Sequence, residues 1–320
     1  MSLGTSLLFL AALSQVTQGF PSLALRQSVT APTPAEVCDS TWSLTQLVDV
    51  AGAHAYHDPL PGEARGPCPA QNALANHGYI DRSGYTNLEE CVSANVQVFN
   101  FGVDFATYLC FTGQLTGGDL VGLTWSIGNS SAFDSSVKSS CSSSGLLGIV
   151  FNLGCGLSKV LGRMLGTPGF GMAQTHNSFE ADSSVLNADW GTTHGLDAST
   201  PDLGAANMFW TKRKTDGTWD DLGIFTDWAS YRMQQGISNN PCYFRAPQAT
   251  LFAALGAYAL VPRMFSNYTV DQPAGTLNSA TLASFYGLLV DSNGKVTSRG
   301  FGKSQIPSNW CVVPKTTRHI

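Results

Sequence analysis

The chain has 320 residues, of which 43% are hydrophobic and only 12% are charged. This length and apolar content are enough for a sizeable core, and no linker or break in composition argues for two domains. The formal net charge is −5, with a pI near 5.6. Such a balance provides no basic surface for nucleic acid or for anionic membranes, so we expect neither as a partner.

The N-terminal segment, residues 1–19, has the order of a secretory signal peptide. An apolar run from Leu7 to Leu13 is followed by small and polar residues, although no Lys or Arg precedes it. Residues 20–34 contain three prolines and no periodicity, and we interpret them as a leader or propeptide. The folded domain is therefore expected over residues 35–320, in a secreted protein or one in the lumen of the secretory pathway.

Several stretches carry apolar residues at helical spacing. The first covers residues 35–50, and a short helix should begin at Pro69 and end near Gly78. Residues 86–111 predict two helices broken near residues 100–102. Further helices are predicted over residues 220–236, 246–264 and 276–290. Because neither the alternation of an all-β protein nor a repeat is visible, the predicted class is mainly α.

The middle of the chain has two segments of unusual composition. Residues 126–144 are rich in Ser, Gly and Asn, which is typical of an exposed loop. The apolar run that follows, residues 145–156, is short and precedes Lys159 and Arg163. A bilayer needs roughly 20 apolar residues, so we expect no membrane span there but a buried segment or the wall of a hydrophobic channel.

Cys68 stands between Pro67 and Pro69 at the predicted start of a helix. Pro69 has no amide hydrogen and a fixed φ, so it suits the first helical position and makes Cys68 the N-cap. The positive end of a helix lowers the pKa of a cysteine, and a thiolate is what a metal or a nucleophilic reaction requires. A disulfide is the alternative interpretation, because most cysteines of secreted chains are paired.

The string that runs from Arg65 to Tyr79, RGPCPAQNALANHGY, closely resembles the proximal segment of the haem-thiolate peroxidases, the fungal chloroperoxidase and unspecific peroxygenase family. The resemblance implies one helical domain around a buried haem b, with Cys68 as the axial ligand of the iron. The other residues that it places at the cofactor are Pro67, Pro69, Asn76 and His77. Seven of the eight cysteines then remain, so at least one is expected to be free or paired between chains.

An acidic segment between His176 and Asp189 offers hard oxygen ligands of the kind that Mg²⁺ prefers. Without other information it is a solvated loop, since acidic side chains are mostly exposed. It is similar, however, to a loop of the long peroxygenases in which magnesium joins the protein to a haem propionate. That resemblance implies a magnesium site made by Glu180, Asp182 and Ser184, with Asp189 a looser match and Ala181 in place of a glycine. His176, one helical turn before Glu180, is interpreted as a structural hydrogen-bonding residue.

The stretch 240–255 resembles the distal segment of the long peroxygenases but departs from it at two positions. That family has an Arg there and, seven residues later, a Glu; here the two positions are Gln248 and Leu255. Seven residues make two helical turns, so both side chains would share one face. Neither can transfer a proton, no glutamate follows Glu180, and Arg245 could replace the missing Arg only in part.

The sequence therefore predicts a secreted haem-thiolate peroxidase or peroxygenase that uses peroxide to oxidise a small apolar substrate, with N-glycans at Asn129 and Asn267. General acid–base catalysis contributes about 10²–10⁴-fold, so turnover should be slow. One alternative is a haem-binding relative without peroxide turnover. Another is a haem enzyme that catalyses a rearrangement, a dehydration or a coupling in natural-product assembly. The last is a disulfide-bonded module without a cofactor.

Overall fold

The fold is described from a computed structural model, over residues 47–119, 122–129, 171–176, 179–189, 198–219, 222–240, 243, 256–266 and 275–312. Within these ranges the chain forms seven α-helices and four short strands, which confirms the mainly α class. The helices are α3 (Pro69–Asn76), α4 (Leu88–Phe99), α5 (Val103–Gly117), α8 (Leu203–Trp210), α9 (Leu222–Asn239), α11 (Ala257–Met264) and α12 (Ser279–Phe285). The strands are β1 (Tyr85–Asn87), β2 (Thr124–Ser126), β3 (Leu288–Val290) and β4 (Val296–Ser298).

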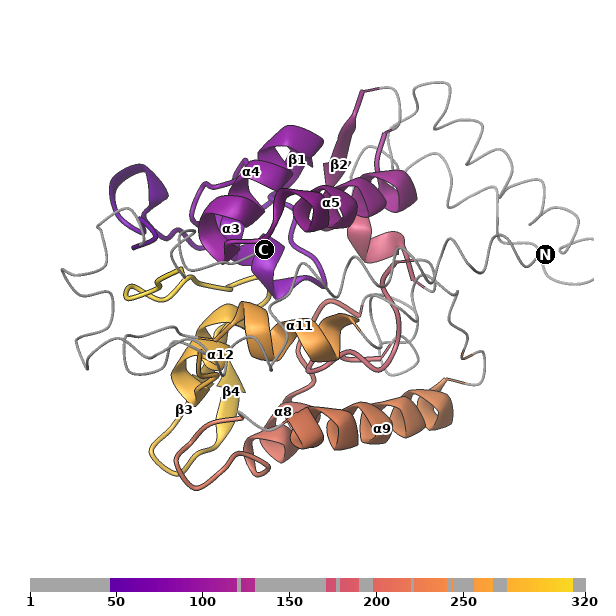
Figure 1. Cartoon of the computed structure of the whole chain (residues 1–320). Helices are drawn as coiled ribbons and strands as arrows, with labels where there is room; N and C mark the ends of the chain where they lie inside the picture. Colours follow the sequence, from indigo (N-terminus) through magenta and orange to yellow (C-terminus); the bar gives the residue numbers. More distant parts are fainter. Residues whose placement is uncertain are drawn as a thin grey trace, which may run out of the picture.

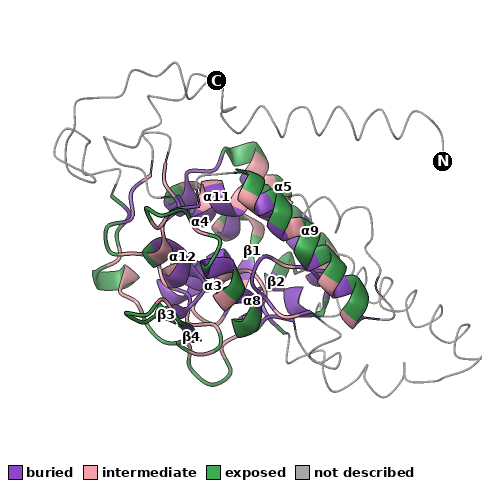
Figure 2. Cartoon of the chain, turned by 90° about the horizontal axis from the view of Figure 1, so that it is seen from below, coloured by how far each residue is buried: buried purple, intermediate pink, exposed green. Residues whose placement is uncertain are grey.

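The helices surround a core in which α3 is central. Figure 1 shows α3, α4 and α5 together on one side and α8 and α9 along the other, with α11 and α12 between them. The strands form two antiparallel pairs, β1 with β2 and β3 with β4, in which Thr86 lies opposite Trp125 and Leu289 opposite Thr297. In Figure 2, α9 exposes one face to solvent, whereas seven of the eight residues of α3 are buried.

The break between α4 and α5 lies where the sequence predicts it. Asn100 ends α4 in the left-handed conformation, with φ of 54°, and Gly102 is the N-cap of α5. Asn tolerates this conformation better than most residues do. The start of α4 is capped by Asn87, whose side chain accepts a hydrogen bond from the Glu90 amide at 2.9 Å.

A disulfide between Cys91 and Cys110 joins α4 to α5 across a sequence separation of 19 residues. Both cysteines are buried, and the side-chain amide of Asn95 lies within 3.7 Å of each sulfur. The side-chain oxygen Oδ1 of Asn95 in turn accepts a hydrogen bond from Gln71 Nε2 of α3 at 3.3 Å. The disulfide therefore stabilises the helix pair against which the N-terminal half of α3 packs.

Three predicted boundaries differ from the structure. Residues 47–50, the described end of the first predicted helix, are not helical, and Leu47 forms an isolated bridge with Cys311. The helix predicted over residues 276–290 is shorter, since it ends at Phe285 and the chain continues into β3. Gly287, with φ of 61°, makes the turn between them. The predicted loop 126–144 begins with the last residue of β2, and its described part includes the buried residues Ser126 and Ile127.

Aromatic side chains fill two parts of the core. One cluster joins α8 and α9 and contains Phe209, Trp210, Trp219, Phe225 and Trp228; the other joins α4, α11 and α12 and contains Phe99, Phe101, Phe265, Phe285 and Trp310. All ten are at most 7% exposed. Within the described part of the chain, no helix is both long and apolar enough to cross a bilayer. The predicted apolar run 145–156, most of the helix 246–264 and the residues before 47 lie outside the described residues.

Candidate functional site

Cys68 is the N-cap of α3 and Pro69 is its first residue, as the sequence predicts. The backbone of Cys68 is extended, with φ of −91° and ψ of 107°, and its side chain makes no capping hydrogen bond. The backbone amides of Ala70 and Gln71 instead lie toward the sulfur and lower the pKa of the thiol. Burial has the larger effect, however, and raises the pKa above its ordinary value.

The amides at the helix end lower the Cys68 pKa as predicted, but burial outweighs them, so the net shift from the protein groups alone is upward and not downward. A helix end is worth about 0.3–1 kcal/mol, which is less than the cost of removing a thiolate from water. A metal cation would supply the missing charge, because a coordinating thiol is deprotonated by the metal itself. The environment of Cys68 is better suited to a metal-bound sulfur than to a free thiolate nucleophile.

Cys68 is the free cysteine among the described residues. Cys91, Cys110 and Cys311 are all disulfide-bonded. Cys68 keeps a free thiol while these other cysteines are oxidised, and it is only partly exposed. An axial thiolate site requires such a sulfur donor. The sulfur and the two amides around it therefore fit a haem iron.

The residues before Cys68 are held by two close contacts. Asn72 of α3 clamps Gly66 from both sides, since the Gly66 amide donates to Asn72 Oδ1 at 2.9 Å and Asn72 Nδ2 donates to the Gly66 carbonyl at 2.8 Å. A β-carbon on Gly66 would lie 1.9 Å from the carbonyl oxygen of Ile127. Only glycine fits this position, and this steric limit explains why Gly66 stands between Arg65 and Pro67.

Arg65 and Asn76 connect this loop to the C-terminal part of the chain. Arg65, 3% exposed, donates from Nε to Asn76 Oδ1 at 2.8 Å. Asn76 Nδ2 donates to the carbonyls of Gly302 and Ser304, both at 2.7 Å. Asn76, placed at the cofactor by the resemblance, thus uses its side-chain amide to hold α3 against residues 302–304.

His77 has a similar structural environment. The amide of Ile306 donates to His77 Nε2 at 3.1 Å, so the ring hydrogen is on Nδ1, which lies 2.7 Å from the carbonyl oxygen of His54. Burial lowers the pKa of the ring, which is therefore neutral at pH 7. Because both ring nitrogens have protein partners, His77 can contact a cofactor only through carbon atoms.

The acidic segment is buried rather than solvated. Glu180, Asp182 and Asp189 are 7%, 1% and 1% exposed. His176 lies between two of them, with Nδ1 at 2.8 Å from Glu180 Oε2 and Nε2 at 3.6 Å from Asp182 Oδ2. This supports the structural interpretation of His176, but residues 176 and 180 are joined by an isolated β-bridge and not by the predicted helical turn.

The magnesium prediction has limited support in these contacts. Asp182 Oδ2 already accepts a hydrogen bond from Asn240 Nδ2 at 2.7 Å. Glu180 Oε2 is likewise paired with His176, and the Ser184 hydroxyl donates to the Ala181 carbonyl at 3.4 Å, so each side chain of the predicted ligand set already has a protein partner. Within the described ranges, no group of three or more His, Cys, Asp or Glu side chains is arranged to hold a metal ion.

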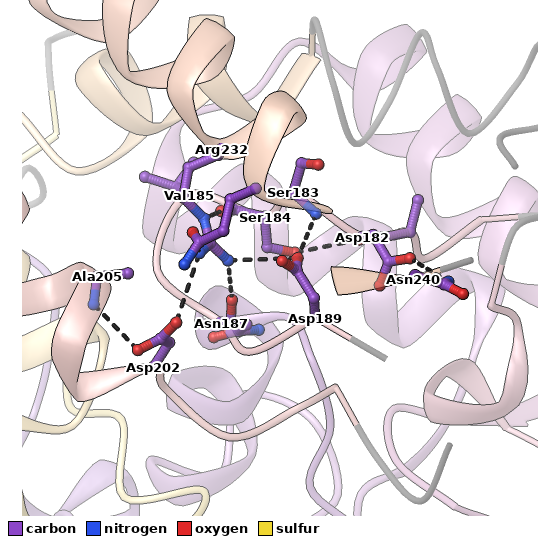
Figure 3. A network of polar contacts seen from close by, with 12 residues as sticks. Asp182, Ser183, Ser184, Val185, Asn187, Asp189, Asp202, Ala205, Arg232 and Asn240 are labelled. Atoms are coloured by element: carbon purple, nitrogen blue, oxygen red, sulfur yellow. Dashed lines mark hydrogen bonds and ion pairs between the residues drawn. The ribbon is translucent and has the colours of Figure 1, made fainter. Parts of the chain in front are cut away.

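Arg232 of α9 organises the rest of this loop (Figure 3). It is 0% exposed and donates from Nε to the Ser184 carbonyl at 3.0 Å and from Nη2 to the Asn187 carbonyl at 2.6 Å. Its charge is balanced by Asp189 at 3.4 Å and Asp202 at 3.5 Å. Burial raises the pKa of Asp189, and Arg232 acts in the opposite direction.

Two further contacts link the loop to its surroundings. Asn187 Nδ2 donates to the carbonyl of Pro67 at 2.8 Å, directly before Cys68. Trp228 Nε1 donates to the Val185 carbonyl at 2.8 Å. The structure thus brings the acidic segment and the Cys68 loop together, although 120 positions separate Asn187 from Pro67.

Sequence reasoning missed Asn187 and Arg232. Phe225, Trp228, Arg232 and Gly236 are the buried residues of α9, at helical spacing along one stripe. A charged residue on an otherwise apolar stripe is a signal of a buried ion pair, and it was available in the sequence. Asn187 gave no such signal.

Other predicted sites are only partly described. Gln248, Arg245, Leu255 and Asn267 lie outside the described residues. Asn129 is exposed, as a glycan acceptor must be, and its side-chain oxygen accepts a hydrogen bond from Gln174 at 2.8 Å.

Comparison with known proteins places this site in a family. Residues 54–315 match the model of peroxidase, family 2, so the chain belongs to this family, the haem-thiolate chloroperoxidases and peroxygenases. It is 33% identical over 274 residues to the dothistromin biosynthesis peroxidase dotB of Dothistroma septosporum. It is 32% identical over 267 residues to the aromatic peroxidase fscJ of Fusarium equiseti. It is 24% identical over 239 residues to an aromatic peroxygenase of Coprinellus radians.

The matched regions cover most of this chain, but they cover a smaller share of two of the relatives. They include 84%, 82% and 73% of the chain, respectively. The aligned part is 58% of the dothistromin biosynthesis peroxidase and 55% of the Fusarium protein, so the chain spans little more than half the length of these two relatives. For the Coprinellus peroxygenase the aligned part is 78%.

Proposed function

We propose that the chain is a secreted haem-thiolate peroxidase or peroxygenase in which Cys68 binds the haem iron and peroxide oxidises a small apolar organic substrate. The observation that carries the proposal is the geometry of Cys68, a free and partly exposed thiol at a helix N-cap with two backbone amides toward its sulfur. The names of the relatives, an aromatic peroxygenase and a peroxidase of dothistromin biosynthesis, support an aromatic substrate in secondary metabolism.

The chain would contribute mainly orientation and charge. When bound, a haem with an axial thiolate supplies peroxide activation, since the sulfur donates electron density toward the O–O bond. The amides of Ala70 and Gln71 stabilise negative charge on the sulfur, while the clamp of Asn72 on Gly66 fixes the loop that leads to it. Apolar core residues pack against the buried side of Cys68.

Proton transfer from the bound peroxide would be the slow step of this reaction. The resemblance of residues 240–255 to the distal segment implies that Gln248 and Leu255 stand where the long peroxygenases carry their Arg and Glu. Gln248 can hold a peroxide oxygen by hydrogen bonds and Arg245 can stabilise negative charge, but neither accepts a proton at neutral pH. We therefore expect slow turnover.

A magnesium ion is a further part of the proposal. Its ligands would be Glu180, Asp182 and the hydroxyl of Ser184, with Asp182 oriented through its other oxygen by Asn240. Metal analysis of the haem-loaded protein tests it, with Glu180→Gln as the variant that should lose the metal.

A secretory location is supported by the buried Cys91–Cys110 disulfide, because such bonds persist in oxidising compartments. Expression in a eukaryotic secretory host, followed by enzymatic deglycosylation, tests it. A loss of mass in the wild type that is absent in Asn129→Gln with Asn267→Gln would support export and glycosylation.

The haem assignment is tested by the spectrum of the reduced carbon monoxide complex. Haem-supplemented expression should give protein with the red-shifted Soret band of a thiolate ligand. Cys68→Ala should lose this band while its near-ultraviolet circular dichroism stays that of a folded chain. A colourless wild-type protein, or a thiolate band retained by Cys68→Ala, would exclude the assignment.

The missing distal pair favours a second candidate, a haem-binding family member that does not turn over peroxide or that uses haem for another reaction. Peroxide titration with a phenolic substrate separates the two candidates once the thiolate spectrum is present. Leu255→Glu combined with Gln248→Arg should raise peroxide turnover by about 10²-fold or more if these positions face the haem. No gain in a folded, haem-loaded variant would show that they do not.

A further inference from the structure

Pro67 has a single polar backbone group, because a proline has no amide hydrogen. That group is the carbonyl of the peptide bond that joins Pro67 to Cys68, and it accepts the hydrogen bond from Asn187 Nδ2 at 2.8 Å. Asn187 is 5% exposed, so this contact is shielded from water. The orientation of the peptide plane that enters Cys68 therefore depends on Asn187.

The backbone of Asn187 is fixed on both sides. It forms an isolated bridge with Pro201, and its neighbours pair with the same segment: the Ala188 amide donates to the Thr200 carbonyl and the Asp202 amide to the Leu186 carbonyl, both at 2.8 Å. The Asn187 carbonyl accepts from Arg232 Nη2 at 2.6 Å. With its backbone fixed in this way, the Asn187 side chain has little freedom to turn away from Pro67.

Arg232 has five N–H groups, and the contacts around it occupy all of them. Nε donates to Ser184, Nη2 to Asn187 and Asp189, and Nη1 to Asp202 and Gln235. A buried guanidinium is tolerated only when its hydrogen bonds are made, and a fully bonded one fixes its partners in one arrangement. Asp202 also caps α8 through its other oxygen, 3.0 Å from the Ala205 amide, so Arg232 joins α8, α9 and the loop in one rigid unit.

We propose that Asn187 and Arg232 are positioning residues for the proximal ligand. Arg232 fixes the loop (Figure 3), and Asn187 fixes the Pro67–Cys68 peptide and with it the direction of the Cys68 sulfur. Asn72 fixes the other side of Pro67 through Gly66. Without Asn187 the peptide is held from one side only, and the sulfur samples directions in which it does not meet the iron. The inference rests on the proposed function, because it takes Cys68 as the haem ligand.

The test compares Asn187→Ala with Asn207→Ala. Asn207 of α8 is a matched control, since its side chain also bonds a distant backbone, donating to the Val296 carbonyl at 2.9 Å and accepting from the Val296 amide at 2.8 Å. Both variants lose a partly buried side-chain-to-backbone contact. Only Asn187→Ala should change the site.

Two measurements are made on the full chain. In the haem-loaded protein, the ratio of thiolate-type to non-thiolate reduced carbon monoxide complex should fall about fivefold in Asn187→Ala, as expected for the loss of one hydrogen bond. In the haem-free protein, the rate of Cys68 alkylation by iodoacetamide should rise by a similar factor. Neither quantity should change in Asn207→Ala.

Arg232→Lys adds a second test, because it keeps the charge and cannot reproduce the five donors. Arg232→Lys should therefore lower the ratio of thiolate-type to non-thiolate complex and raise the alkylation rate of Cys68, as Asn187→Ala does. Asn187→Leu, which keeps the volume and removes the donor without adding a charge, replaces Asn187→Ala if the latter is not recovered folded.

The proposal is overturned if folded Asn187 variants keep the wild-type spectrum and alkylation rate, or if Asn207→Ala changes both to the same extent. Failure of the proposed function is a different result. It would be a wild-type protein without a thiolate spectrum, and the alkylation rates would still decide whether Asn187 positions Cys68.

Discussion

Arg65 donates a hydrogen bond from Nε to the side-chain oxygen of Asn76 at 2.8 Å, and through this contact the loop before Cys68 is joined to the helix after it. The amide of Asn76 continues the connection to the Gly302 and Ser304 carbonyls. Asn76 is 0% exposed, so no water can replace it.

Asn76→Ala leaves three partners without their hydrogen bonds, and two of these contacts, to Arg65 Nε and to the Ser304 carbonyl, are buried. Each unsatisfied group costs about 1–3 kcal/mol, and we expect a loss of about 3 kcal/mol or more in the free energy of unfolding. Urea unfolding of the haem-free chain measures it. Gln97→Ala is the control, since the Gln97 amide bonds only to Ser93 on the exposed face of α4 and should change stability by less than about 0.5 kcal/mol.

Gly66→Ala should destabilise the loop before Cys68. The added β-carbon would lie 1.9 Å from the Ile127 carbonyl oxygen, so the backbone must move. Overpacking of this kind costs about 1–3 kcal/mol, and the thiolate spectrum should weaken as well. Gly102→Ala, where no atom lies within 4 Å of the new carbon, should leave the spectrum unchanged; equal effects in the two variants would contradict the steric explanation.

The Cys91–Cys110 disulfide should contribute about 3 kcal/mol, the value expected from chain entropy for a closed loop of this size. The double variant Cys91→Ala, Cys110→Ala measures this contribution by urea unfolding. Because Gln71 of α3 bonds to Asn95 beside the disulfide, we also expect weaker haem retention in the double variant. Unchanged stability would show that the packing of α4 on α5 suffices.

His77 should make the protein less stable in acid. Burial lowers its folded-state pKa below the ordinary value of 6.5, so the unfolded chain binds the proton first as the pH falls. The stability that His77 contributes is complete above about pH 6.5 and is lost as the pH falls through the lowered pKa. The free energy of unfolding, measured between pH 7.5 and 5, should decrease less in His77→Gln, which keeps a donor and an acceptor without titrating.

The sequence predicted the parts of this structure that depend on local chemistry. The N-cap at Cys68, the first helical residue Pro69 and the break at Asn100 all follow from backbone preferences of single residues. The boundary at Phe285 was not predictable in this way. The helical spacing continues beyond it, and only the pairing of β3 with β4 ends the helix.

In the candidate site, too, the local features were predictable from the sequence and the long-range contacts were not. Cys68 was identified from a short string, whereas its supports at Ile127, Asn187 and Ser304 come from distant segments that no local pattern connects to it. The pKa of Cys68 was predicted from the helix end alone, and burial, which depends on the whole fold, has the larger effect.

The hydrogen bond from the Ile306 amide to His77 spans 229 positions of the sequence. Helix α3 can therefore reach its final position only after residues 302–306 have been synthesised. Contacts of such long range form late and slowly in folding. If Cys68 is the haem ligand that we propose, its supporting helix would be fixed only after these residues have been made, so haem capture would follow their synthesis.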